Sequence, residues 1–158
     1  MRSARDIEDF FKLLKCDVEL KEKNKFLVEE QAKKLSNFRV MIEDNLHFKQ
    51  RNEYSDLLEL FLSNQIDTDN FSFCFIAQYD KTNRQLRDME QNVEKNFDKL
   101  SSLLMEDKDQ DRKSQIGTSL MFMYDFCDSF TSDFESACED TINLKTSAKK
   151  LLNQLKQS

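Results

Sequence analysis

The sequence predicts an all-α protein: an antiparallel up-and-down helical bundle with an additional long N-terminal helix. Its 158 residues contain one glycine and no proline, although strand hairpins and ordered turns depend on these residues. Fourteen phenylalanines and a hydrophobic content of 39% supply material for a core, whereas disordered chains are poor in aromatic residues. Along most of the chain, apolar residues recur at the three-and-four spacing of an amphipathic helix.

The first predicted helical segment covers residues 4–48. Apolar residues near its two ends keep helical spacing, but residues 19–34 between them are mostly charged. This pattern fits either one long helix with a solvated centre or two helices with a break near Asn24. We therefore expect a charged helix or coiled-coil arm over residues 1–52, which packs along the rest of the chain or projects from it. The helical bundle is expected over residues 53–158.

Two apolar segments, joined by a short polar turn, make up residues 57–80. Their pattern predicts a helical hairpin that nucleates the bundle. Asp67 or Thr68 can cap the second helix by accepting its free backbone N–H groups. Ile66 and Phe71 flank that cap at close to the spacing of a hydrophobic staple.

The helix after this turn is predicted to run from about residue 68 to residue 104. Its apolar seam alternates nearly as heptad a and d positions, as in a coiled coil. Thr82 and Asn96 fall on the seam and would set its register if they are buried. A charged loop that contains Gly117, the single glycine, is expected to follow.

Two further helices complete the predicted bundle. One carries apolar residues from 116 to 130, and the last runs over residues 133–156. Ser132 and Glu135 have the spacing of a capping box, which marks a break between them. Because the connections are short, neighbouring helices are expected to pack antiparallel.

The sequence offers no group of residues typical of catalysis, and we predict that the protein is not an enzyme and carries no cofactor or metal ion. No glycine-rich loop is present to cradle phosphates. The single histidine, His47, is expected to lie exposed near a helix end. Four cysteines without a C-x-x-C pair are expected to be buried free thiols. They lie at positions 16, 74, 127 and 138.

Residues 107–118 partly match a calcium-binding EF-hand loop, with aspartates at its first, third and fifth positions. However, Arg112 stands where the loop needs glycine, and Thr118 stands where it needs a bidentate glutamate. We interpret this segment as a solvated charged loop.

Charge is unevenly distributed. Residues 105–140 contain ten acidic and three basic residues, whereas residues 141–158 contain four lysines and no acid. The basic tail is expected to lie against the acidic surface or to complement the dipole of the last helix. A net charge of −6 disfavours direct nucleic-acid binding. Neither a membrane span nor a targeting segment is recognisable, so we expect an intracellular soluble protein, cytoplasmic or organellar, such as in a plastid stroma.

The acidic segment MYDFCDSFTSDFE interleaves acids with aromatic residues. One interpretation is an amphipathic helix with phenylalanines inside and solvated aspartates outside. The functional interpretation is a binding face for a basic protein, since acidic patches steer basic partners. The residues predicted to form this partner-binding face are Tyr124, Asp125, Asp128, Asp133 and Glu135.

The chain resembles the small helical immunity proteins of the colicin D type over residues 57–157. The likeness rests on the run Leu57, Leu58, Phe61, Leu62, Ile66, Phe71, Phe75, Tyr79 and Asp80, and on the acidic segment. Hypothetical proteins encoded in some algal plastid genomes are similar. The resemblance implies an antiparallel helical bundle and an acidic surface that plugs the basic active site of a tRNA-cutting toxin. The charged N-terminal segment departs from that family, and an accessory subunit of an organellar or bacterial complex, docked through this segment, is the alternative.

Overall fold

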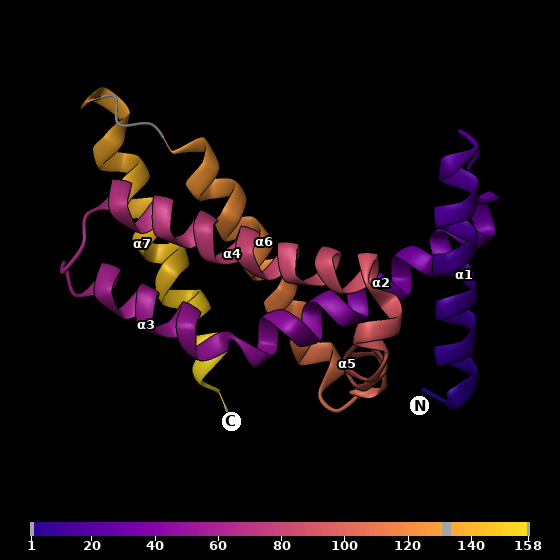
Figure 1. The fold of residues 1–158 in the computed structure, drawn as a ribbon. Helices are drawn as coiled ribbons and strands as arrows, with labels where there is room; N and C mark the ends of the chain where they lie inside the picture. The colour runs from indigo at the N-terminus through magenta and orange to yellow at the C-terminus, as the bar shows by residue number, and fades with distance from the viewer. Residues whose placement is uncertain (1, 131–133, 158) are drawn as a thin grey trace.

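The computed structural model describes the backbone of residues 2–130 and 134–157 and the side chains of residues 2–130 and 139–157. Within these residues every regular element is a helix and no strand occurs, which confirms the all-α class (Figure 1). The helices are α1 (Ala4–Glu22), α2 (Glu29–Lys49), α3 (Arg51–Leu62), α4 (Thr68–Gln91), α5 (Val93–Met105), α6 (Gln110–Ser129) and α7 (Phe134–Lys156).

The N-terminal segment forms two helices. α1 ends at Glu22 and α2 begins at Glu29, and Asn24 between them has a φ of 55°. Asparagine tolerates this left-handed conformation better than most residues. The break predicted near Asn24 is therefore correct, and the alternative of a single long helix is wrong. α1 stands across α2 and α5 (Figure 1), and its Phe10 and Leu14 are buried there.

α3 and α4 form the predicted helical hairpin. The rings of Phe61 and Phe71 stack with centroids 4.2 Å apart and planes 8° from parallel. Asp67 caps α4, and its carboxylate accepts a hydrogen bond from the backbone N–H of Asn70 at 2.8 Å. Ile66, on the other side of this cap, packs against the same core.

The single helix predicted over residues 68–104 is interrupted at Asn92, where α4 ends and α5 begins. Asparagine side chains compete with helical hydrogen bonding by bonding to nearby backbone groups. Here the Asn92 amide donates to the Asp88 carbonyl at 3.4 Å, and the Asn96 amide donates to the Asn92 carbonyl at 3.0 Å. Thr82 is fully buried, as a register-setting position requires, whereas Asn96 is only partly buried.

α6 begins at Gln110, seven residues before the glycine that was predicted to lie in a loop. In its first turn, the charged groups of Arg112 and Lys113 lie over the ring of Phe48 on α2. Gly117 lies inside α6, where a Cβ atom would stand 2.1 Å from Asp44 Oδ1. The absence of a side chain at Gly117 therefore allows α2 and α6 to pack closely at this point.

The interior contains two apolar clusters. Cluster A joins α3, the first half of α4, α6 and α7. Cluster B joins α1, α2, the second half of α4, and α5. Buried polar side chains lie between the clusters along the helices, and we call them the polar layer: Asp44, Asn45 and His47 on α2, Thr82 on α4, and Lys113 on α6. α4 is thus shared by two cores, with polar residues where one ends and the other begins.

α7 packs between α3 and α6 through Leu144, Ala148, Leu151 and Leu155. Its basic residues contact α3: Lys156 pairs with Glu59, and Lys145 donates to Asn64. Lys156 thus reaches α3, and Lys145 reaches the turn that follows α3. The predicted capping box of Ser132 and Glu135 lies outside the described side chains.

The predicted division at residue 52 stays a prediction, but α2 packs extensively on α5 and α6 across it. No helix within residues 2–130 and 134–157 is both long and apolar enough to cross a bilayer.

Candidate partner-binding face

The predicted acidic face is centred on one surface of α6. Asp125 and Asp128 are exposed there, and Tyr124 beside them is half-buried. The Tyr124 ring packs on Tyr79 of α4 at a centroid distance of 4.8 Å. Asp133 and the side chain of Glu135, which were also predicted for this face, lie outside the described residues.

Asp80 of α4 joins this face although the sequence did not suggest it. Burial raises the pKa of Tyr124, and so do the charge of Asp80, a hydrogen bond to Asp80, and the charges of Asp128 and Asp125. The charges of three carboxylates thus act on one phenol, and two helices that are distant in sequence supply them. We call Asp80, Tyr124, Asp125 and Asp128 the acidic face.

A column of stacked rings supports the acidic face from inside. The His47 ring stacks on Tyr79 at 4.6 Å with planes 24° apart, and Tyr79 continues the column to Tyr124. Burial is the main cause that raises the pKa of Tyr79 to about 12, and Glu43 is the second. The column holds the phenol of Tyr124 in a fixed position between α2 and the surface.

His47 is almost fully buried, with 1% of its surface exposed, so its predicted exposure is wrong. Although it lies in the last turn of α2, the helices that follow fold over it. Its Nε2 lies 3.0 Å from Asn83 Oδ1, which can only accept, so Nε2 carries a proton. Its Nδ1 lies 2.8 Å from the Tyr54 hydroxyl, which can donate to it or accept from it. Both ring nitrogens thus have a hydrogen-bond partner, and His47 acts here as a buried structural group.

Glu43 and Asp44 add two more carboxylates near the inner end of the column. Burial is the main cause that raises the pKa of Asp44 to about 7, and the charge of Glu43 adds to it. Glu43 Oε1 lies 3.7 Å from His47 Nε2.

Cations are scarce around these acids. Among the described residues, no lysine or arginine comes within 4.0 Å of the carboxylates of Asp44, Asp80, Asp125 or Asp128. The negative charge of this side of the molecule is thus not neutralised by ion pairs.

Exposed apolar side chains border the acidic face. Phe73, which lies two helical turns before Asp80 on α4, is 74% exposed. Met121 lies one turn before Tyr124 and Asp125 on α6 and is 44% exposed. An acidic centre with apolar flanks is suited to a partner that carries both basic and apolar side chains.

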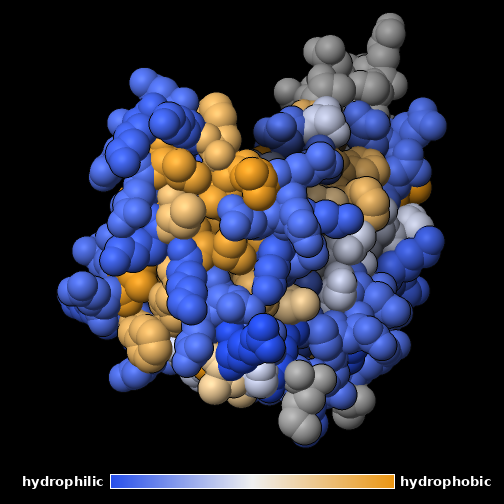
Figure 2. Space-filling view, turned by 90° about the vertical axis from the view of Figure 1, so that its right-hand side faces the viewer, coloured by the Kyte–Doolittle hydropathy of each residue, from blue (hydrophilic) through white to orange (hydrophobic). Residues whose placement is uncertain are grey.

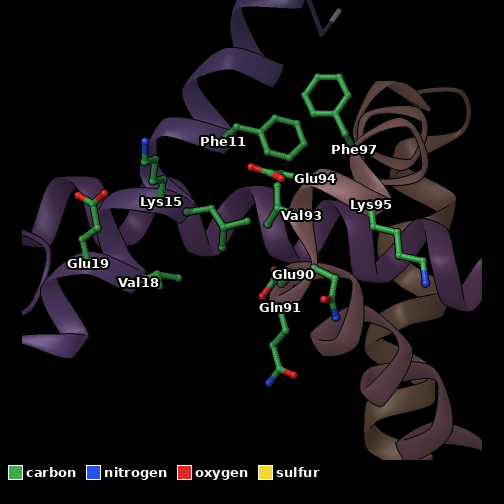
Figure 3. A pocket seen from close by; sticks show the side chains of 12 residues that line it. Phe11, Lys15, Val18, Glu19, Glu90, Gln91, Val93, Glu94, Lys95 and Phe97 are labelled. Carbon is green, nitrogen blue, oxygen red and sulfur yellow. The ribbon is translucent and has the colours of Figure 1, made fainter.

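A second surface feature is an apolar cleft of about 780 Å³ where α1 crosses the junction of α4 and α5. The rings of Phe11 and Phe97, which line it, stack on each other at a centroid distance of 4.6 Å, with Val93 nearby (Figure 3). Lys15, Glu19, Glu90, Glu94 and Lys95 contribute charges to the lining. From the side on which α1 lies, Figure 2 shows apolar atoms gathered in a hollow bordered by hydrophilic ones.

The cysteines differ in exposure more than the sequence predicted. Cys127 is buried, Cys16 is partly buried and Cys74 is exposed, and all three are free thiols. Burial raises the pKa of Cys127 to about 12. Within the described part of the chain, no three His, Cys, Asp or Glu side chains gather in a way that could hold a metal ion.

No protein-family model, no curated protein and no solved structure matches this chain.

Proposed function

We propose that the protein is a non-enzymatic protein-binding module whose acidic face docks a basic protein partner, in the manner of an immunity-type inhibitor. The observation that supports this proposal is that Asp80, Asp125 and Asp128 all act on Tyr124, while none of them forms an ion pair with a lysine or arginine among the described residues. Acids that only solvate a surface are commonly interspersed with bases. Acids left together raise the negative potential that attracts a basic partner.

The rigidity of the face favours binding. Tyr124 is held by Tyr79 and His47, so little side-chain entropy is lost when a partner covers it. Tyrosine is among the residues that most often dominate binding energy at protein interfaces. The carboxylates around it speed the encounter and select basic partners, while the aromatic and apolar groups supply affinity.

The test is a pull-down from lysate of the source cell with a charge-matched control. The face variant carries Asp80→Asn, Asp125→Asn and Asp128→Asn. The control carries Glu8→Gln, Asp56→Asn and Asp98→Asn on α1, α3 and α5, which are exposed and form no ion pair among the described residues. Both variants lose the same net charge, so a difference between them reports position.

We expect the wild type and the control variant to retain a basic protein at low salt and to release it at high salt, because exposed charges are screened. The face variant should retain little of it even at low salt. Equal capture by the face variant and the control variant would contradict the proposal.

The alternative function is a structural or accessory subunit of a bacterial or organellar complex, docked through the N-terminal helices. The observation that favours it is the turn between α1 and α2, where Phe26 is 81% exposed and Val28 is 64% exposed. Deletion of residues 1–48 would remove half of cluster B, so point variants are the proper test. If Phe26→Ser with Val28→Ser abolishes capture of a salt-resistant partner while the face variant retains it, docking through this turn is supported and the acidic-face proposal fails.

A further inference from the structure

A basic pocket of about 410 Å³ lies where the end of α2, the start of α6 and the end of α7 meet. Five cationic side chains line it in a protein whose net charge is −6, and two acids, Glu106 and Asp109, accompany them. The cations are Lys49, Arg51, Lys108, Arg112 and Lys113. The pocket is distinct from the acidic face and does not depend on the function proposed above.

The ring of Phe48 gathers three of these cations. The guanidinium carbons of Arg51 and Arg112 lie 4.3 and 5.2 Å from the ring centroid, and the Lys113 ammonium lies 5.5 Å from it. Each contact is a favourable cation–π interaction. Nevertheless, three positive charges around one ring repel each other, and an anion between them would relieve that repulsion.

Two buried polar atoms in this pocket, Arg112 Nε and Asn45 Oδ1, lack a hydrogen-bond partner among the described residues. Lys113 is only 4% exposed, and its nearest carboxylate oxygen, on Glu106, is 3.7 Å away, too far for a hydrogen bond. Arg112 Nε is buried and makes no hydrogen bond. Arg112 Nη2 donates to the carbonyls of Gln154 and Gln157, and Lys113 forms an ion pair with Glu106. A buried donor without an acceptor, such as Arg112 Nε, is nevertheless costly. A ligand that accepts from both Arg112 Nε and Lys113 would remove this cost.

Asn45 sets a different requirement for a ligand in this pocket, because one acceptor of its side chain is unpaired among the described residues. Its amide nitrogen donates to the carbonyls of Leu103 and Glu106 at 2.6 and 2.9 Å, which fixes the orientation of the amide. Its Oδ1 is therefore an acceptor, and it is buried without a donor in the described structure. The group that completes this pocket must accept hydrogen bonds from cations and also donate one.

The start of α6 also offers hydrogen-bond donors to an anion. Its N-cap residue, Asp109, has a φ of 55° and makes no side-chain cap to the helix. The first backbone N–H groups of this 20-residue helix are thus left for another acceptor. The positive end of the helix dipole adds to the field of the side-chain cations.

We propose that this pocket binds a phosphate group accompanied by a hydroxyl donor, either hydrogen phosphate or the phosphate of a small hydroxylated metabolite. Lys113, Arg112 Nε and the α6 N-terminus donate to the phosphate oxygens, and Asn45 Oδ1 accepts from the hydroxyl. Sulfate has the same shape but carries no proton at neutral pH. It would leave Asn45 Oδ1 unpaired, so the pocket should discriminate between the two anions.

The test is calorimetric titration of the full chain with inorganic phosphate, glycerol phosphate, methyl phosphate and sulfate at constant ionic strength. We expect inorganic phosphate or glycerol phosphate to bind at least about tenfold more tightly than sulfate. Tighter binding of glycerol phosphate than of methyl phosphate would identify a hydroxylated metabolite, and preference for inorganic phosphate would identify the free ion. Equal affinity for phosphate and sulfate, or no saturable binding, would overturn the proposal.

Variants tie the binding to the pocket. Lys113→Met should weaken phosphate binding at least about tenfold, and its melting temperature shows whether it folds. The double variant of the exposed lysines Lys49→Ala and Lys108→Ala keeps every buried contact and should weaken binding severalfold. The matched control is Lys81→Ala combined with Lys33→Ala, which removes two exposed lysines outside the pocket and should bind as the wild type does. Loss of binding in this control equal to that in the double variant of the pocket would mean that phosphate responds only to overall charge.

Discussion

A substitution of Asp44 tests how much the burial of a charged group costs this fold. The Asp44 carboxyl is 8% exposed, packs against Gly117 of α6, and has a pKa raised to about 7, chiefly by burial. Asparagine has nearly the same shape as the protonated acid and cannot ionise. Asp44→Asn therefore removes the cost of burying a negative charge while it leaves the packing in place.

The magnitude follows from the difference between the folded and unfolded pKa values. A change from 3.8 to about 7, at about 1.4 kcal/mol per pKa unit, would cost the charged form about 4 kcal/mol. The carboxyl keeps some contact with water, which screens charge, and we therefore take about half, or ~2 kcal/mol.

The sign depends on pH. Below about pH 4 both folded and unfolded chains hold the Asp44 proton, so the charge costs nothing. As the pH rises from about 4 to about 7, the unfolded chain loses the proton first, and the wild type loses stability relative to the variant. Above about pH 7 the difference is constant. Glu43 and His47 lie beside residue 44 in both proteins, so their effects largely cancel in the comparison.

The assay is urea unfolding followed by circular dichroism at about pH 4 and about pH 8. Asp44→Asn should match the wild type at the lower pH and exceed it by ~2 kcal/mol at the higher pH, which corresponds to roughly 4–8 °C in melting temperature. The exposed Asp56→Asn on α3 is the control and should show no such gain. A variant that is equally stable relative to the wild type at both pH values would refute the argument from burial.

Three further predictions concern buried groups. Gly117→Ala should destabilise the wild type by about 1–3 kcal/mol through overpacking. In an Asp44→Ala background it should instead stabilise the protein by up to ~1 kcal/mol, as alanine does relative to glycine in a helix. Equal effects in both backgrounds, measured by urea unfolding, would show that Asp44 is not the cause. His47→Leu should lower the unfolding free energy by about 1–3 kcal/mol because two buried hydrogen bonds lose their partner, and an unchanged urea midpoint would contradict this. Cys74 should react with a thiol reagent far faster than Cys127, whose thiol is buried and has a raised pKa; peptide mass spectrometry after brief labelling would read this, and similar rates would contradict it.

Most of the helical segments were predictable because apolar residues recur in them at helical spacing, and some of their ends carry a recognisable polar signal. The carboxylate of Asp67 and the asparagine at position 24 are local features, and both acted where the sequence placed them. The break at Asn92 was missed because the heptad-like pattern continues across it, although the two halves serve different cores.

The candidate sites were less predictable because they depend on helices that meet from distant parts of the chain. Asp80 reaches Tyr124 only when α4 packs on α6. Gly117 looked like a loop residue, yet it lies in α6 because Asp44 approaches it there. His47 looked like a surface residue because the sequence around it does not tell which helices fold over the end of α2. The spacing of apolar residues predicts which face of a helix is buried, but it does not predict which other helix packs against that face.

The division of the interior by the polar layer has a consequence for how the protein opens. Cluster A is closed by α3, α6 and α7, whereas cluster B depends on α1 and α5, and α1 makes few contacts beyond α2 and α5. Opening cluster B would expose polar groups that water can solvate at the boundary, so it need not disrupt cluster A. Amide protons should therefore exchange in two groups, those of α1 and α5 before those of α3, α6 and α7. The molecule would behave as two cooperative units that share α4 as a common spine.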